Sequence, residues 1–470
     1  MPAERIGTSI PSAQSRRSRG RAPGHVRTAY DPLAVTEIVH ADLAALVADA
    51  ERCYVERNPE SRRLHERRAQ VMPGGNTRSV IHVPPFPLTI VRGEGARLTD
   101  ADGHVYVDFL GEYTAGLYGH SHPAIVAAIR EALEDGMVFG APNRYETQLA
   151  ELLCARFNSI ELVRFCNSGT EANMFALSLA RVVTGKPAIM VFESGYHGGV
   201  FLFADAAGSP INAPFPFVVG QYNDAEGAAQ LIAEHAHELA AVLVDPLQGA
   251  AGVIPAEREF LVALRDATAA NDILLVFDEI MTSRLSTGGL QRVVGVTPDL
   301  TTLGKYIGGG LAFGAFGGRA DLMSRFDPSR ADALQHAGTF NNAVLTMAAG
   351  TAGLRIYTEA EVDRLNGLGD RLRDRLNAFA ATGDLPFVAT GYGSMVGLHW
   401  TRGPVRRSSD SPAAPELRAL LHLHLLEHGY SYARRGFIAL SLPIAEADVD
   451  GFADATEAFL TERSAAADNA

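Results

Sequence analysis

Beyond His122, short apolar runs alternate with segments of helical periodicity. Runs in which nearly every residue is apolar are typical of strands buried on both faces of a sheet. Helices between such strands supply the right-handed crossovers that parallel strands require. The alternation therefore predicts an α/β domain in which helices flank a mostly parallel central sheet. The strand candidates span residues 162–166, 188–192, 217–221, 241–244 and 273–277, and two intervening helices span residues 170–184 and 259–270.

The chain is too long for one small core, because a domain usually holds roughly 100 to 200 residues and this sequence has 470. We expect a large α/β domain over residues 101–342. Residues 38–100 and 343–470 are expected to form a smaller α+β domain together. Residues 1–37 are expected to be a disordered tail, since their arginine cluster is followed by glycine and proline instead of an apolar core.

The two flanking segments carry patterns that suit a smaller α+β domain. Helical spacing runs over residues 42–70 and should end before Pro73. Alternation over residues 86–109, around a turn at residues 100–103, predicts an antiparallel hairpin. The later patterns predict helices over residues 343–357 and 359–381, strands near residues 387–399 and 430–442, and a final helix from residue 447.

Charge and composition exclude several classes of function. The formal net charge is -13, and no basic stripe is interleaved with aromatic residues, so a nucleic-acid partner is not expected. No uninterrupted apolar run reaches about 18 residues, so no membrane span is expected. The cysteines Cys53, Cys154 and Cys166 fit neither a disulfide framework nor a CxxC metal motif, which favours a reducing, cytoplasmic location.

A polar turn joins one predicted strand to the helix that follows it. Its sequence is Asn167-Ser168-Gly169-Thr170-Glu171. Backbone N–H groups and the helix dipole converge on an anion at such a position, and two hydroxyls could add donors. The same residues would also suit an ordinary helix N-cap. Taken alone, the turn therefore leaves a phosphate site and a structural cap both open.

Asp278 and Lys305 supply two further chemical groups. Asp278 ends an apolar run, so it should project from the carboxyl end of a strand, where open α/β sheets bind ligands. Lys305 follows beyond another strand candidate, in a glycine-lined turn. Pyridoxal phosphate (PLP) needs three contacts. They are a carboxylate that keeps its pyridine nitrogen protonated, an amine that condenses with its aldehyde, and a turn that binds its phosphate. Burial near a cofactor would lower the pKa of the lysine and make it a nucleophile.

Other candidates are ambiguous when each is taken alone. Tyr196 follows a strand and could stack on a planar ring, or could simply pack in its loop. Thr339 could donate to a phosphate or cap a helix. His120 and His122 suggest a metal, but no third ligand of suitable type and spacing accompanies them, so no metal site is expected.

Together and in this order, these motifs resemble the class III aminotransferases of PLP fold type I, over residues 42–462. The resemblance implies that Lys305 forms the Schiff base with the cofactor and that Asp278 binds the pyridine nitrogen. Ser168, Gly169 and Thr170 would hold the phosphate, Tyr196 would stack on the ring and Gln248 would bond the ring oxygen. Thr339 would reach the cofactor phosphate of a partner subunit, since such enzymes are homodimers with shared active sites. Asp245 stands where many members have glutamate, which leaves its role open.

Within this class, the chain is most similar to bacterial β-amino-acid aminotransferases of the β-phenylalanine type. Arg78 and Arg435 match positions that bind substrate carboxylates there, and a guanidinium can grip a carboxylate through two hydrogen bonds. The stretches that carry the similarity are residues 72–79, 112–116, 279–284 and 435–437.

The resemblance implies ping-pong transfer of an amino group from an aromatic β-amino acid to an α-keto acid, either 2-oxoglutarate or pyruvate. Two alternatives remain open at the level of sequence. A glutamate-1-semialdehyde aminomutase has a similar fold and a similar Pro73-Gly74-Gly75 opening, but it isomerises its substrate without consuming a keto acid. A PLP-binding protein without catalysis is the other alternative. The enantiomer and the acceptor depend on the shape of the pocket.

Overall fold

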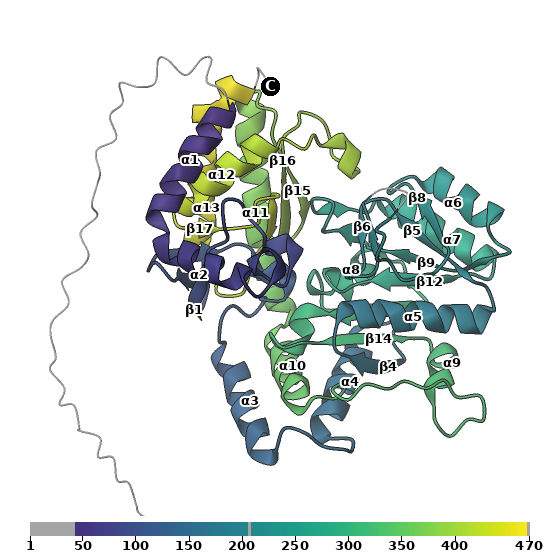
Figure 1. Cartoon of the computed structure of the whole chain (residues 1–470). Coiled ribbons are helices and arrows are strands. Elements are labelled where there is room, and N and C mark those ends of the chain that lie inside the picture. The colour runs from purple at the N-terminus through teal and green to yellow at the C-terminus, as the bar shows by residue number, and fades with distance from the viewer. Residues whose placement is uncertain (1–42, 205–207, 468–470) are drawn as a thin grey trace, which may run out of the picture. The chain divides into compact units, whose positions relative to one another are not determined.

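A seven-stranded mixed sheet forms the centre of the chain in the computed structural model, which describes residues 43–204 and 208–467 (Figure 1). The predicted tail at residues 1–37 lies outside the described residues. The strand order is β4-β14-β13-β12-β9-β5-β8. These strands are β4 (Leu162–Cys166), β5 (Ala188–Phe192), β8 (Phe217–Gly220), β9 (Leu239–Val244), β12 (Leu274–Asp278), β13 (Leu300–Gly304) and β14 (Gly314–Gly318).

The apolar runs predicted five of these strands within two residues at each end. β8, β5, β9, β12 and β13 pair in parallel, as expected. The run at Gly314–Gly318 was not predicted, because three of its five residues are glycine and glycine is depleted in strands. β14 pairs antiparallel with both β13 and β4. A side chain at Gly314 would collide with the backbone oxygen of Ser168, so close packing explains the glycine.

Helices cover both faces of the sheet, and successive strand residues alternate between the two layers. On one face, α5 (Gly169–Thr184) packs on Ile189 and Val191. On the other face, α6 (Ala225–Glu234) and α7 (Arg258–Ala270) pack on Met190 and Phe192. The remaining helices and short strands of this region are α3 (Pro123–Asp135), α4 (Arg144–Arg156), α8 (Gly289–Val294), α9 (Ala320–Met323), β6 (Gly195–Tyr196), β7 (Leu202–Phe203), β10 (Leu247–Gln248) and β11 (Ile254–Pro255).

The helix predicted over residues 42–70 is two helices, α1 (Leu43–Arg57) and α2 (Pro59–Ala69). The prediction of one continuous helix was wrong, because Pro59 cannot continue a helix and instead begins a new one. The predicted hairpin is β2 (Arg97–Asp100) with β3 (Val105–Asp108), and Gly103 lies in its turn at φ 91°. β1 (Ile90–Glu94) and β17 (Tyr430–Ser431) extend it to four strands in the order β1-β2-β3-β17.

The C-terminal part contains the predicted helices α10 (Val344–Ile356), α11 (Glu359–Thr382) and α13 (Glu446–Ala467). β15 (Val388–Tyr392), β16 (Met395–His399) and β18 (Phe437–Ala439) form a three-stranded sheet. α12 (Pro415–Glu427) was not predicted. All the described residues belong to one compact unit, and the domain limits drawn from the sequence stay a prediction. Within the described residues, no helix has the length and apolar character needed to cross a bilayer.

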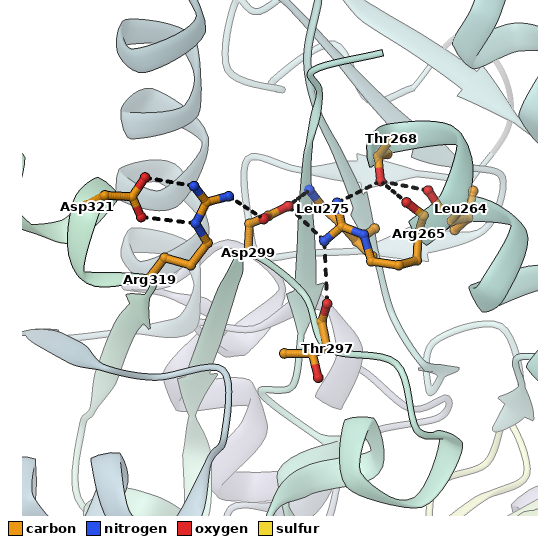
Figure 2. Close-up of polar contacts among 8 residues, drawn as sticks. All are labelled: Leu264, Arg265, Thr268, Leu275, Thr297, Asp299, Arg319 and Asp321. Atoms are coloured by element: carbon orange, nitrogen blue, oxygen red, sulfur yellow. Dashed lines mark hydrogen bonds and ion pairs between the residues drawn. The ribbon is translucent and has the colours of Figure 1, made fainter. Parts of the chain in front are cut away.

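A buried network holds the starts of the central strands together (Figure 2). Asp299, which precedes β13 and is 7% exposed, accepts hydrogen bonds from the backbone N–H of Leu275 at 2.9 Å and from Arg265 at 2.9 Å. Its other oxygen accepts from Arg319 at 2.9 Å, and Arg319 in turn pairs with Asp321. One carboxylate therefore links β12, β13, α7 and the end of β14, at the edge opposite the carboxyl ends of the parallel strands.

Candidate active site

Three of the predicted site elements meet at the carboxyl ends of neighbouring strands. Asp278 is the last residue of β12, Lys305 directly follows β13, and the polar turn at Asn167 directly follows β4. β12 and β13 pair in parallel, with Asp278 opposite Thr302. β14 joins β13 to β4, which places the turn in the same sheet edge region. The topology thus brings together residues that are far apart in the sequence.

The turn before α5 is both a helix cap and a constricted approach to the sheet. Ser168 is the N-cap, and its hydroxyl accepts a hydrogen bond from the N–H of Glu171 at 3.2 Å. The Thr170 hydroxyl accepts from the N–H of Gly199 at 3.1 Å. A Cβ on Gly169 would lie 2.5 Å from Ile280 Cδ1, so a larger residue would require the Ile280 side chain to move. The turn is a helix cap, and the first N–H groups of the helix lack intrahelical acceptors and would suit a phosphate.

Asp278 is held by three donors and is 4% exposed. Its Oδ2 accepts from Asn173 Nδ2 at 2.8 Å and lies 2.8 Å from His197 Nδ1, while Oδ1 accepts from the N–H of Ile280 at 3.1 Å. Since a carboxylate only accepts hydrogen bonds, Nδ1 of His197 carries the proton. These bonds fix the orientation of the carboxylate, which would keep a pyridine nitrogen protonated.

His197 lies between two carboxylates in a buried cluster. Its Nδ1 is 3.7 Å from Asp245 as well as 2.8 Å from Asp278. Burial lowers the pKa of His197, but Asp245 and Asp278 outweigh it and the pKa is raised overall. Burial raises the pKa of Asp245, and the nearby Asp278 charge adds to the rise. The donor atoms of these three residues lie within 4.8 Å of one another, a spacing that a metal site could also have. The bonds from Asn173 and Ile280 instead make the cluster a support for Asp278.

Asn173 and His197 are functional candidates that the sequence patterns did not indicate. Both lie close to residues that were singled out: Asn173 follows the polar turn by two residues, and His197 directly follows Tyr196. Their function depends on a contact with Asp278 across 105 and 81 residues of chain, respectively. No local pattern signals such a contact.

Lys305 is partly buried, and its amine is anchored on the backbone. Its Nζ donates to the carbonyl of Tyr113 at 2.6 Å, and its φ of 53° lies in the left-handed region. Burial lowers the pKa of Lys305 to about 8, and the Arg78 guanidinium contributes to the decrease. A substantial fraction of the amine is therefore neutral and nucleophilic near neutral pH. Lys186 is the only other lysine in the sequence.

The backbone that receives Lys305 has an uncommon conformation. The residues of Gly111–Thr114 have φ values of 52°, 45°, 52° and 81° in order. Left-handed backbone costs a non-glycine residue about 1–2 kcal/mol, and a β-branched residue there is an outlier. The segment directs the Tyr113 carbonyl toward Lys305 while the Tyr113 ring, 7% exposed, packs in the site. Strain of this kind persists at sites where the surroundings fix the conformation.

Two arginines flank the ring of Tyr113. The guanidinium carbon of Arg78 lies 5.8 Å from the ring centroid and that of Arg435 lies 5.0 Å from it. Arg78 also pairs with Glu112. The buried Nε of Arg435 has no hydrogen-bond partner among the described residues, and burial lowers the pKa of this arginine. Both arginines, Glu112 and Tyr113 line one cavity of about 1150 Å³.

The remaining candidates lie in different settings. Gln248 is 2% exposed, and its Nε2 donates to the carbonyl of Glu193 at 2.9 Å. Its Oε1 is buried without a hydrogen-bond partner in the described structure, so the amide has capacity for a ligand. Tyr196, in β6, is 47% exposed. Thr339 lies on an exposed turn, beside Asn341, whose Oδ1 accepts from Asn167 at 3.0 Å.

His120 and His122 have structural contacts of their own. Nε2 of His120 lies 3.0 Å from Asp108 Oδ2. His122 is the N-cap of α3, and its Nδ1 accepts from the N–H of Ala124 at 3.3 Å. Each imidazole thus serves a local role.

The donor set fits PLP. The cofactor's ring would need a buried, hydrogen-bonded carboxylate and an amide oxygen without a partner, and both are present. Its aldehyde would need a lysine whose pKa is near 8, and its phosphate a capped helix N-terminus, and the site has these as well.

The sequence matches one known family over most of its length. A family model described as aminotransferase class III matches residues 79–408. A beta-phenylalanine transaminase from Variovorax paradoxus is 51% identical over 425 residues, which are 90% of this chain and 98% of that protein. A crystal structure of a beta-phenylalanine aminotransferase from the same organism has a TM-score of 0.88 at 50% identity, over 90% of this chain and 98% of its own.

More distant structures share the fold. An omega-transaminase from Sphaerobacter thermophilus has a TM-score of 0.82 at 39% identity, covering 88% of this chain and 99% of its own. A glutamate-1-semialdehyde aminomutase from Pseudomonas aeruginosa has the same TM-score at 25% identity, covering 89% of this chain and 98% of its own.

Proposed function

The chain belongs to the class III aminotransferases, and we propose that it transfers the amino group of an aromatic β-amino acid such as β-phenylalanine to an α-keto acid, 2-oxoglutarate or pyruvate. Family membership makes it a PLP-dependent transaminase and confirms the expected fold type I architecture. The amino donor, the acceptor and the ping-pong order belong to the proposal.

The observation that carries the proposal is the pair of guanidinium groups next to the Tyr113 ring. Both substrates of such an enzyme carry a carboxylate. In a β-amino acid the carboxylate lies one carbon farther from the amine-bearing carbon than it does in an α-amino acid. Arg78 and Arg435 give one cavity two places to hold a carboxylate, which matches two substrate geometries. The similarity to the Variovorax transaminase points to the same donor.

The residues of the chain divide the work as follows. PLP supplies, when bound, an aldehyde that takes up the amino group and a ring that withdraws electrons from the reacting carbon. Asp278, held by Asn173 and His197, would keep the ring nitrogen protonated. The turn at Ser168–Thr170 would hold the phosphate, and Gln248 would bond the ring oxygen.

Lys305 would bind the cofactor at rest and move the proton at the amine-bearing carbon once substrate has entered. Its partly neutral amine suits that task, since a base must be unprotonated to accept a proton. The carbonyl of Tyr113 would orient Nζ between these roles. Tyr196 would cover the ring.

We also propose that the enzyme works as a homodimer with Thr339 reaching the partner's cofactor phosphate. Large apolar side chains are exposed in the last turn of α3, just after it and next to Thr339, where burial against a second subunit would remove them from water. They are Leu133, Met137, Val138, Phe139 and Phe340, which are 41% to 69% exposed. Sedimentation analysis of the holoenzyme tests this; a monomer at micromolar concentration would contradict it.

The deciding experiment uses the visible spectrum of the purified holoenzyme. Addition of β-phenylalanine without a keto acid should remove the absorption band of the bound cofactor, and 2-oxoglutarate or pyruvate should restore it. The two enantiomers are added separately. Lys305→Ala should show no such cycle. A band that does not respond to β-phenylalanine would reject the donor, and turnover of glutamate-1-semialdehyde without a keto acid would identify an aminomutase instead.

The arginines can be tested by steady-state kinetics with each substrate varied in turn. Arg78→Gln and Arg435→Gln should each raise the KM of a carboxylate substrate by about tenfold or more, because a charge-assisted bond of roughly 1.5–3 kcal/mol is lost. If each arginine serves mainly one substrate, the two variants should affect donor and acceptor unequally. Unchanged KM values for both substrates in both variants would contradict the carboxylate assignment.

A further inference from the structure

The active-site cavity continues beyond the two substrate arginines into a second basic cluster. Its lining also includes Arg418 and His422, one helical turn apart on α12, and Arg434, which directly precedes Arg435. Tyr432 packs among them, with its ring 5.7 Å from that of His422. Arg434 influences the pKa values of His422 and Tyr432, whereas Arg435 is influenced by Tyr113 and Tyr196. The two neighbouring arginines therefore face different surroundings.

This cluster presents donors that nothing in the described chain satisfies. The buried Nε of Arg418 has no hydrogen-bond partner among the described residues. Burial lowers the pKa of His422 to about 4, so its ring is neutral; because the ring bonds the Tyr432 backbone, its open Nδ1 is an acceptor and not a donor. His422 is only 8% exposed, yet it lines the cavity. Within the described residues, Arg434 makes one side-chain hydrogen bond, from Nη1 to the carbonyl of Pro84 at 3.3 Å, which leaves its other donors available. Buried donors without partners are rare in folded proteins and require a ligand or water.

The charges in this part of the cavity are not balanced by the chain. Two acidic residues line the cavity, and both are engaged: Asp108 with His120, and Glu112 with Arg78. Neither Arg418 nor Arg434 forms an ion pair with any carboxylate of the described residues, although the whole chain carries a net charge of -13. A partly buried guanidinium without an anion is costly, so an anion from solution would be stabilised here.

We propose that Arg418 and Arg434 form a second carboxylate-binding site in the cavity that Arg78 and Arg435 line, separate from those two arginines. A carboxylate substrate held there stands beside the reaction site before it enters, and its occupancy raises the local substrate concentration. The assignment depends on the proposed function in one respect only, namely that the anions entering the cavity are carboxylates.

The test is calorimetric titration of the holoenzyme with 3-phenylpropionate, which is β-phenylalanine without its amine and cannot react. Two sites per subunit are expected. The double variant Arg78→Gln/Arg435→Gln should retain one of them, and adding Arg418→Gln should weaken that remaining site by at least about tenfold, as loss of a charge-assisted bond predicts. Because the probe is inert, the outcome does not depend on whether β-phenylalanine is a substrate.

Controls separate binding from folding. Arg434→Gln, at a position that is only partly buried, should weaken the same site if Arg418→Gln fails to fold, and Arg418→Lys should restore part of the affinity. Arg63→Gln on α2, which breaks an exposed pair with Glu60, should change nothing. One site per subunit in the unmodified enzyme, or a remaining site that is indifferent to both Arg418→Gln and Arg434→Gln, overturns the proposal. Inorganic phosphate that binds this site more tightly than 3-phenylpropionate overturns the carboxylate assignment.

Discussion

The acid strength of Lys305 responds to two neighbours of opposite charge. Burial is the main reason that its pKa falls from 10.5 to about 8, and Arg78 lowers it further, while Glu112 acts in the opposite direction. Arg78 and Glu112 are paired with each other, so removing one leaves the other unopposed near the amine. In the cofactor-free protein, Arg78→Gln should therefore raise the pKa of Lys305, and Glu112→Gln should lower it.

The effect on the free amine is large. At pH 7.5, a lysine whose pKa is about 8 is roughly one quarter neutral, whereas one at 10.5 is about 0.1% neutral, a difference of about 240-fold. While most of the amine is protonated, a change in the pKa of Lys305 changes the neutral fraction by about the same factor as it changes the acid dissociation constant. The two variants should thus move the reactivity of Lys305 at pH 7.5 in opposite directions.

The assay is trace acetylation of the cofactor-free protein with acetic anhydride at a series of pH values, read by mass spectrometry. Only a neutral amine reacts, and the chain contains only Lys186 and Lys305, so each site gives its own peptide signal. The Lys305 midpoint should lie near pH 8 in the unmodified protein. A midpoint above 10, or a shift of both variants in the same direction, would refute the electrostatic argument.

Three further outcomes concern stability. Lys305→Met should stabilise the cofactor-free protein by about 2–3 kcal/mol below pH 8, because a buried charge is removed. The gain should vanish as the pH approaches 10.5. Urea unfolding at pH 7 and pH 10 measures both values, and an equal gain at the two pH values would contradict the prediction. Asp299→Asn should lower the free energy of unfolding by about 3 kcal/mol, since two arginines lose their carboxylate. Asp321→Asn, at the exposed end of the network, should lower it by less than about 0.5 kcal/mol. Equal losses would contradict a stabilising role for the buried Asp299 carboxylate. Thr114→Gly should raise the free energy of unfolding by about 1 kcal/mol, because it removes the strain of a β-branched residue in left-handed backbone and a buried hydroxyl without a partner. A lower melting temperature of the variant would show that the lost packing outweighs the strain.

The parts of this structure that the sequence predicted are those set by short-range pattern. Continuous apolar runs identify strands buried on both faces, and a polar residue at the end of such a run must lie at the sheet edge. That reasoning predicts Asp278 and the turn at Ser168 at the ends of strands, which is where the structure has them. The motif resemblance then named the family, which the comparisons confirm. The residue roles in cofactor and substrate binding remain proposals.

The parts that could not be predicted depend on contacts across the chain. β14 is rich in glycine because Gly314 packs against Ser168, and no local propensity reveals that contact. Asn173 and His197 became functional candidates only when they were found on Asp278. The left-handed backbone at Glu112 and Tyr113 could not be predicted, because neither position is a glycine. The break at Pro59 is different, because proline rules alone could have predicted it.

Because the chain has only two lysines, reagents that modify lysine side chains can act at only two positions. Lys186 lies just before β5, at the edge where the parallel strands begin, and its Nζ donates to the carbonyls of Asn271 and Asp272 at 3.2 and 3.3 Å. Lys305 lies at the opposite edge, within electrostatic range of Arg78 and Arg435. Reagents that attack lysine side chains thus have one target near the surface once the cofactor occupies the other. Where coupling to an aldehyde or activated-ester support uses a lysine side chain of the holoenzyme, it should use Lys186, which leaves the sheet edge that carries Lys305 turned away from the support.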